Sequence, residues 1–125
     1  MLNNLKSMAG LAGLLKDLPR IKARMDELKK SLADQTVTAE AGGGAVRVTA
    51  TGLLRVASIE LDDTLMSGLS GPVTPDQQSM AEELIADAVN NALQAARLMA
   101  ETEAAAVANE LGLPLPPGGL GGLIS

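Results

Sequence analysis

A period-two alternation of apolar and polar residues marks the stretch between residues 36 and 61 as sheet. Three short runs place small apolar residues at every second position: Val37, Ala39 and Ala41, then Val46, Val48 and Ala50, then Ala57, Ile59 and Leu61. Gly42-Gly43-Gly44 separates the first two runs and Gly52 separates the last two. Because glycine turns between short strands are typical of hairpins, the pattern predicts a three-stranded antiparallel meander whose third strand runs from Arg55 to Leu61.

Helical periodicity precedes this sheet. Apolar residues recur at gaps of three and four along a heptad seam made of Leu11, Leu14, Leu18, Ile21, Met25, Leu28 and Leu32. Pro19 interrupts the seam and is tolerated best in a first helical turn. The spacing therefore predicts a firm helix from about Pro19 to Asp34, with a Pro-kinked helix that begins earlier as the alternative.

A second, longer helix is predicted after the sheet. Asp62 and Asp63 open a loop that contains glycine and serine, and Thr74-Pro75-Asp76-Gln77 is a typical helix start. The helix is expected to reach about Leu111, with an apolar stripe formed by Ile85, Val89, Ala92, Ala96 and Met99. Beyond Met99 the sequence is rich in alanine and offers little large apolar surface, so this half is expected to project from the body.

Composition favours self-association. The hydrophobic fraction is 46%, but much of it is alanine, and the chain has no Phe, Tyr or Trp. Since alanine buries little apolar area, a monomeric core of this kind is thin. We therefore expect an oligomer, most simply a homodimer.

Missing residue types exclude several chemistries. The chain has neither Cys nor His, which removes disulfides, the usual zinc sites and the Ser–His or Cys–His nucleophile pairs. No aromatic residue is present to stack on single-stranded bases. We expect no catalytic site, no metal and no cofactor, and the sequence favours a protein that is not an enzyme.

Charge is divided unevenly along the chain. Residues 1–55 hold nine basic and five acidic residues, whereas residues 56–125 hold one basic and ten acidic residues, for a net charge of −5. Such a division is compatible with a basic face that meets a polyanion, or with two helices that merely differ in solvated charge. The candidate phosphate-binding residues are Lys16, Arg20, Lys22, Arg24, Lys29 and Lys30 in the first helix, Arg47 and Arg55 in the sheet, and Arg97 in the last helix.

Neither end of the chain shows a pattern that predicts a further domain. The apolar run near the N-terminus is too short for a membrane span and lacks a cleavage site, so we expect neither export nor membrane attachment. Residues 113–125 mix Pro, Gly and Leu without a period. We expect one domain over residues 1–112, followed by a flexible tail at 113–125.

The order of these elements resembles the YbaB/EbfC family of nucleoid-associated proteins. The resemblance is carried by Val46-Arg47-Val48-Thr49 with Gly52, by Ile59-Glu60-Leu61-Asp62, by Ala88, Asn90 and Ala92, and by Leu115-Pro116-Pro117-Gly118. It implies an α+β protein that forms a tweezer-like homodimer and binds double-stranded DNA with low or modest sequence preference. Family members also carry basic residues where this chain has Ala57, Ser58, Gln94 and Ala95, which shifts the expected DNA contact towards the first helix.

Two functions remain open at this point. The first is a nucleoid-associated protein of the cytoplasm that contributes to chromosome organisation or gene regulation through phosphate contacts. The alternative is a protein-interaction module that acts with replication or repair proteins and binds DNA weakly or not at all. The acidic second half of the chain motivates this alternative, because it suits a basic protein surface.

Overall fold

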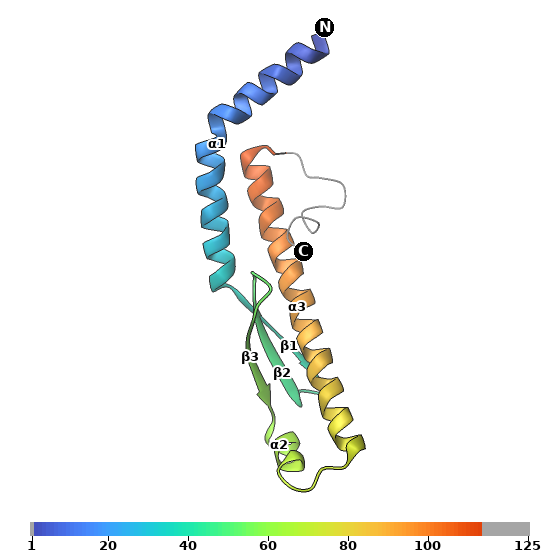
Figure 1. Cartoon of the computed structure of the whole chain (residues 1–125). Helices are drawn as coiled ribbons and strands as arrows, with labels where there is room; N and C mark the ends of the chain where they lie inside the picture. Colours follow the sequence, from blue (N-terminus) through green and yellow to red (C-terminus); the bar gives the residue numbers. More distant parts are fainter. Residues whose placement is uncertain (1, 114–125) are drawn as a thin grey trace.

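The computed structural model describes residues 2–113, with side chains described from Ala12 onward except Leu14. Its elements are α1 (Leu2–Asp34), β1 (Thr36–Ala41), β2 (Val46–Thr51), β3 (Val56–Leu61), α2 (Asp63–Leu69) and α3 (Pro75–Leu111). The predicted α+β class, with two long helices around a small sheet, is confirmed (Figure 1). Apart from Leu113, the predicted tail lies outside the described residues.

The sheet is the predicted antiparallel meander, with strand order β1-β2-β3. The glycine triplet forms the first turn, where Gly42, Gly43 and Gly44 have φ values of 66°, 67° and 96°. Because L side chains rarely adopt this left-handed region, glycine is the residue that lets the hairpin close after so few residues.

The third strand corrects one sequence expectation. It begins at Val56 instead of Arg55, and Ile59 and Leu61 lie opposite Val48 and Val46 as the alternation predicts. Near the start of the strand, however, Val56 lies opposite Ala50, because the register shifts at this point. The shift inserts Ala57 as an extra residue, so Ala57 does not continue the apolar face as predicted.

The first half of α3 covers the sheet and makes the tightest part of the core. Val46, Val48 and Ala50 of β2 pack with Ala88, Ala92 and Ala96 of α3, and all six have no exposed surface. Alanine at these positions lets the helix backbone approach the strands closely. The predicted α3 stripe is thus correct for Ala92 and Ala96, while the larger Ile85 and Val89 lie partly buried beside this cluster. We call the sheet with this half of α3 the body.

The second half of α3 extends beyond the sheet as expected, but it does so packed against α1. Leu28 and Leu32 of α1 pack against Ala100, Ala104 and Val107, which are each at most 6% exposed. The two helices lie side by side beyond the sheet (Figure 1). The large apolar surface that α3 lacks is therefore supplied by α1, and we call this helix pair the arm.

Helix α1 starts far earlier than the firm helix predicted from Pro19, which agrees with the kinked alternative. Pro19 lies inside the helix, and the N-terminal part of α1 is bent relative to the rest and extends beyond the end of α3 (Figure 1). Proline removes a backbone hydrogen bond and bends a helix in this way. Among the seam residues whose side chains the structure describes, Leu28 and Leu32 are buried, whereas Leu18 and Met25 are 50% and 39% exposed.

The segment between sheet and α3 contains a short helix where the sequence predicted a loop. Asp62 caps α2 by accepting a hydrogen bond from the Leu65 amide at 2.8 Å. An Asp N-cap is a common helix start, but the glycine and serine residues that follow are typical of a loop, so the sequence did not predict this helix. By contrast, the start of α3 is as predicted, with Thr74 and Gln77 completing a reciprocal capping box.

A glycine at the second hairpin holds the arm on the body. The Gly52 amide donates hydrogen bonds to the carbonyls of Leu32 at 2.9 Å and Gln35 at 3.0 Å. A Cβ atom at this position would lie 2.7 Å from the Leu32 carbonyl oxygen, so only glycine fits. This contact fixes where α1 leaves the sheet. No helix among residues 2–113 is both long and apolar enough to cross a membrane.

Candidate nucleic-acid interface

Three lysines of α1 form the most accessible basic group in the arm. Lys22, Lys29 and Lys30 are exposed, and none of them takes part in an ion pair within residues 2–113. Leu28 and Leu32 turn towards α3, and helical geometry places the lysines on other faces of α1. The spacing of Asp26 from Lys22 and Lys30 would allow pairing, but the structure contains neither pair. These cations are therefore available to an external anion.

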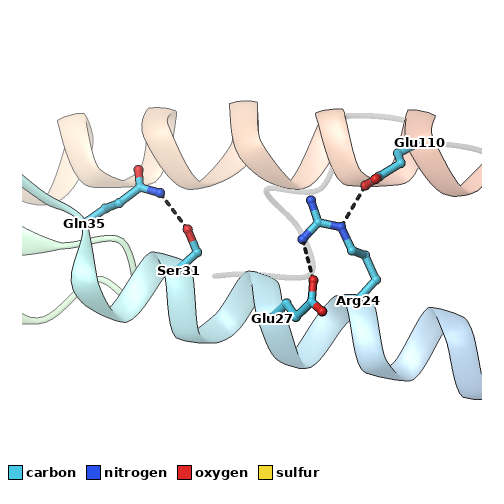
Figure 2. A network of polar contacts seen from close by, with 5 residues as sticks. All are labelled: Arg24, Glu27, Ser31, Gln35 and Glu110. Carbon is cyan, nitrogen blue, oxygen red and sulfur yellow. Dashed lines mark hydrogen bonds and ion pairs between the residues drawn. The ribbon is translucent and has the colours of Figure 1, made fainter.

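Arg24 is committed to the protein itself. Its Nε donates to Glu110 Oε2 at 2.8 Å and its Nη1 to Glu27 Oε2 at 3.2 Å (Figure 2). The hydrogen bond with Glu110 is the main cause that raises the pKa of Arg24 above its ordinary value. Glu110 lies near the end of α3, and the ion pair therefore joins the two helices of the arm.

Lys16 and Arg20 lie on the part of α1 that extends past α3. Arg20 Nη2 lies 3.3 Å from Asp17 Oδ2, but the two side chains are 59% and 54% exposed. An ion pair this open to water is weak and exchanges readily with another partner. Lys16 is exposed. Both residues thus keep their basic character.

Arg47 projects from the face of the sheet that α3 does not cover. Its Nη2 lies 2.7 Å from Glu40 Oε1 on β1, and Glu60 of β3 lies opposite Arg47 in the register. Two carboxylates thus flank a single guanidinium on this face. The local charge is acidic overall, which does not favour phosphate binding here.

Arg55 and Arg97 lie near the second hairpin, on the side of the body where α3 leaves the strand β3 uncovered. Arg55 follows the second hairpin and is exposed, while Arg97 lines a hollow of about 530 Å³ together with Leu54, Leu93 and Leu98. Leu54 comes from the same hairpin as Arg55, so the fold brings these two arginines to one side.

The sequence shows in part which basic residues have carboxylate partners. Glu27 stands three residues after Arg24, and this spacing predicts a pair on one helix face. Glu110 lies 86 residues from Arg24, and no local pattern connects them. Only the packing of α1 on α3 shows that Arg24 differs from its lysine neighbours.

An uncovered apolar surface lies beside the basic groups. Helix α3 packs on β1 and β2 but barely reaches β3, which leaves the edge strand open. The exposed apolar residues here are Leu53, Val56, Ile59 and Leu98, with exposures of 44%, 41%, 46% and 60%. Single exposed apolar residues are ordinary, but a group along an unpaired strand edge is typical of an interaction surface.

Comparison with known proteins places this architecture. The crystal structure of the uncharacterized protein HP0035 from Helicobacter pylori superposes with a TM-score of 0.51 and 24% sequence identity. The match covers 70% of this chain and 93% of that one, and it shows a shared fold. Residues 8–111, which include α3 to its end and nearly all of the arm, match the YbaB/EbfC DNA-binding family. The chain belongs to the YbaB/EbfC DNA-binding family.

Proposed function

We propose that the protein is a homodimer that binds duplex DNA mainly through Lys22, Lys29 and Lys30 of α1. The observation that carries this assignment is the exposure of these three lysines without an ion-pair partner among the described residues, in a family of DNA-binding proteins. Phosphates are the natural ligands of such cations, and they are the same in every sequence. The expected binding therefore has low or modest sequence preference, as suits a role in chromosome organisation or gene regulation at the nucleoid.

The other predicted residues take graded roles in this proposal. Lys16 and Arg20 extend the basic surface along α1, and Arg55 and Arg97 add charge at the open side of the body. Arg24 and Arg47 contribute least, because each would first have to leave its carboxylate partners. The protein reads no base with an aromatic side chain, since it has none.

The homodimer is supported by the open edge of the sheet. Strand β3 presents unpaired backbone groups together with Val56 and Ile59, and Leu98 of α3 lies on the same side. A second copy placed there would cover apolar surface that a monomer leaves in water. Two arms would then extend from a shared centre, and the lysines would act as six cations instead of three.

The test is a fluorescence-anisotropy titration of labelled duplex DNA at several salt concentrations. The wild-type protein is compared with a Lys22/Lys29/Lys30→Ala variant, and with a Lys→Arg variant at the same positions as a charge-matched control. Loss of six phosphate contacts per dimer should lower the slope of log K against log salt by about 5. The arginine variant should keep the slope.

Two results would contradict the proposal. An alanine variant that binds with the wild-type salt slope would place the DNA contact elsewhere. Absence of wild-type binding at low salt would favour the alternative of a protein-interaction module that acts with replication or repair proteins.

A further inference from the structure

The tip of the molecule that carries α2 holds an apolar hollow whose role DNA binding does not explain. A pocket of about 410 Å³ lies between α2, the first turns of α3 and the glycine hairpin. Leu65, Leu69 and Met80 line it, and Met80 is 64% exposed. Met66 of α2 is also 50% exposed. The flexible side chain of Met80, at the wall of the hollow, lets this surface adapt to an incoming apolar group.

The rim of this hollow is acidic. Asp62 lines it, and Asp63 and Asp76 are exposed neighbours in the first turns of α2 and α3. No lysine or arginine occurs between residues 56 and 96, so no side chain of the tip offsets these carboxylates. The tip is therefore suited to a partner that is apolar and basic at once.

The opposite end of the molecule has this complementary character. Leu15 and Leu18 of α1 are 64% and 50% exposed, because α3 ends before it can cover them. Lys16, Arg20 and Lys22 lie on or just after the same stretch of helix, where the single acidic residue, Asp17, pairs with Arg20 at 3.3 Å, so the stretch is basic overall. This stretch is an amphipathic basic helix without a partner in the chain described by residues 2–113.

The two surfaces cannot meet within one chain. Helix α3 has 37 residues, and at 1.5 Å per residue it is about 55 Å long. The pocket adjoins its first turns, whereas the N-terminal part of α1 lies beyond its last ones (Figure 1). Any contact between them must therefore join separate molecules.

We propose that the α1 segment around Leu15 and Leu18 of one molecule docks into the α2–α3 tip of another copy. A leucine would enter the hollow beside Met80, and Lys16 or Arg20 would face Asp63 and Asp76. The contact joins two different surfaces at opposite ends, so it does not close on itself and builds an open chain of molecules. Lys29 and Lys30 lie further along α1 and stay free, which allows a chain of this kind to follow a DNA duplex.

Disulfide cross-linking in the absence of DNA tests this contact directly, because the natural chain has no cysteine. A Leu18→Cys protein is mixed with a Met80→Cys protein under mild oxidation. The control mixture pairs Leu18→Cys with Ala106→Cys, whose position is exposed on α3 outside the proposed contact. The expected result is a mixed disulfide that forms several-fold faster in the first mixture. Equal rates in the two mixtures would overturn the inference.

A charge exchange makes the test independent of any loss of folding. Sedimentation velocity should show that an Asp63→Lys/Asp76→Lys protein associates less at low salt than the wild type. Mixing it with a Lys16→Glu/Arg20→Glu protein should restore the larger species, because the exchanged charges again attract. Failure of this mixture to restore association would contradict the docking.

The inference stands apart from DNA binding. Loss of DNA affinity in a Lys29→Ala/Lys30→Ala protein with unchanged cross-linking supports two separate surfaces, because these two lysines lie outside the proposed docking stretch. Intact DNA binding without cross-linking overturns the docking and leaves the proposed function in place.

Discussion

The body and the arm are both built on α3, yet the two halves of this helix are used differently. In the body, alanines of α3 meet short side chains of β2 with no exposed surface. In the arm, alanines meet the leucines of α1, and small exposed fractions remain. The body thus fixes the fold by close approach of backbones, whereas the arm offers a long charged surface to its surroundings. The same residue type serves both, because what faces it decides how tightly it packs.

Replacing one buried alanine by leucine in each half of α3 should give the largest difference in stability between body and arm. Ala92→Leu places extra methylene groups where α3 touches β2, and it should lower the free energy of unfolding by about 2–3 kcal/mol. Ala104→Leu in the arm should cost under about 1 kcal/mol, because the helix pair can move apart slightly. Chemical denaturation measures both, and equal losses would show that the arm is packed as rigidly as the body.

The contact of Gly52 with Leu32 and Gln35, where the arm meets the body, should be nearly as sensitive to substitution. Gly52→Ala pushes a Cβ atom against the Leu32 backbone and weakens the two amide hydrogen bonds there, at an expected cost of about 1–3 kcal/mol. Gly13→Ala is the matched control, since nothing lies within 4 Å of its Cβ and alanine favours helix by roughly 1 kcal/mol. A Gly52→Ala protein as stable as the control would show that the close contact with the Leu32 backbone does not require glycine.

A buried hydroxyl near the same hairpin should respond in the opposite direction. Thr51 Oγ1 is buried and has no hydrogen-bond partner among the described residues. Thr51→Val replaces it with a methyl group of similar shape, which should raise the free energy of unfolding by about 1 kcal/mol. Thermal unfolding measures the change, with Thr38→Val as control because Thr38 loses its 3.1 Å contact with the Thr49 hydroxyl. A lower midpoint for Thr51→Val would show that its hydroxyl is satisfied in solution.

The smallest expected effect concerns the ion pair that ties the arm together. Glu110→Gln removes the charge of the shorter of the two ion pairs of Arg24 and leaves the exposed pair with Glu27, so the guanidinium becomes more available to phosphate. DNA affinity at low salt should rise about two- to threefold, since one charged contact near the surface is worth only a fraction of a kcal/mol. Anisotropy titration measures the change, and Glu103→Gln on the same helix serves as control. Unchanged affinity would indicate that Arg24 does not reach the DNA.

The elements themselves could be predicted because their signals are local. Alternation gave the three strands, the Thr74–Gln77 box gave the start of α3, and the glycine triplet gave the first turn. Local signals failed where two of them competed. The glycine and serine residues after Asp62 hid α2, and Pro19 suggested a late start for a helix that in fact begins at Leu2.

The sequence identified the basic residues of the candidate site, but it did not show which of them form ion pairs within the protein. Counting basic residues led to nine positions, and the spacing along α1 grouped six of them. It could not distinguish Arg24 from Lys29, because the difference depends on Glu110 at the far end of the chain. It also treated Arg47 as basic surface, although Glu40 on the neighbouring strand neutralises it.

By itself, the sequence determined the order of helices and strands, the lack of histidine, cysteine and aromatic chemistry, and the basic character of α1. These are properties of single residues and of short periodic runs. Only the tertiary structure decided that α1 supplies the leucines that α3 lacks, and that β3 is left uncovered. It also showed which basic side chains form ion pairs with carboxylates and which have no such partner among the described residues. The physical reason is that burial and ion pairing depend on which distant segments come within a few ångströms, and no local pattern specifies that distance.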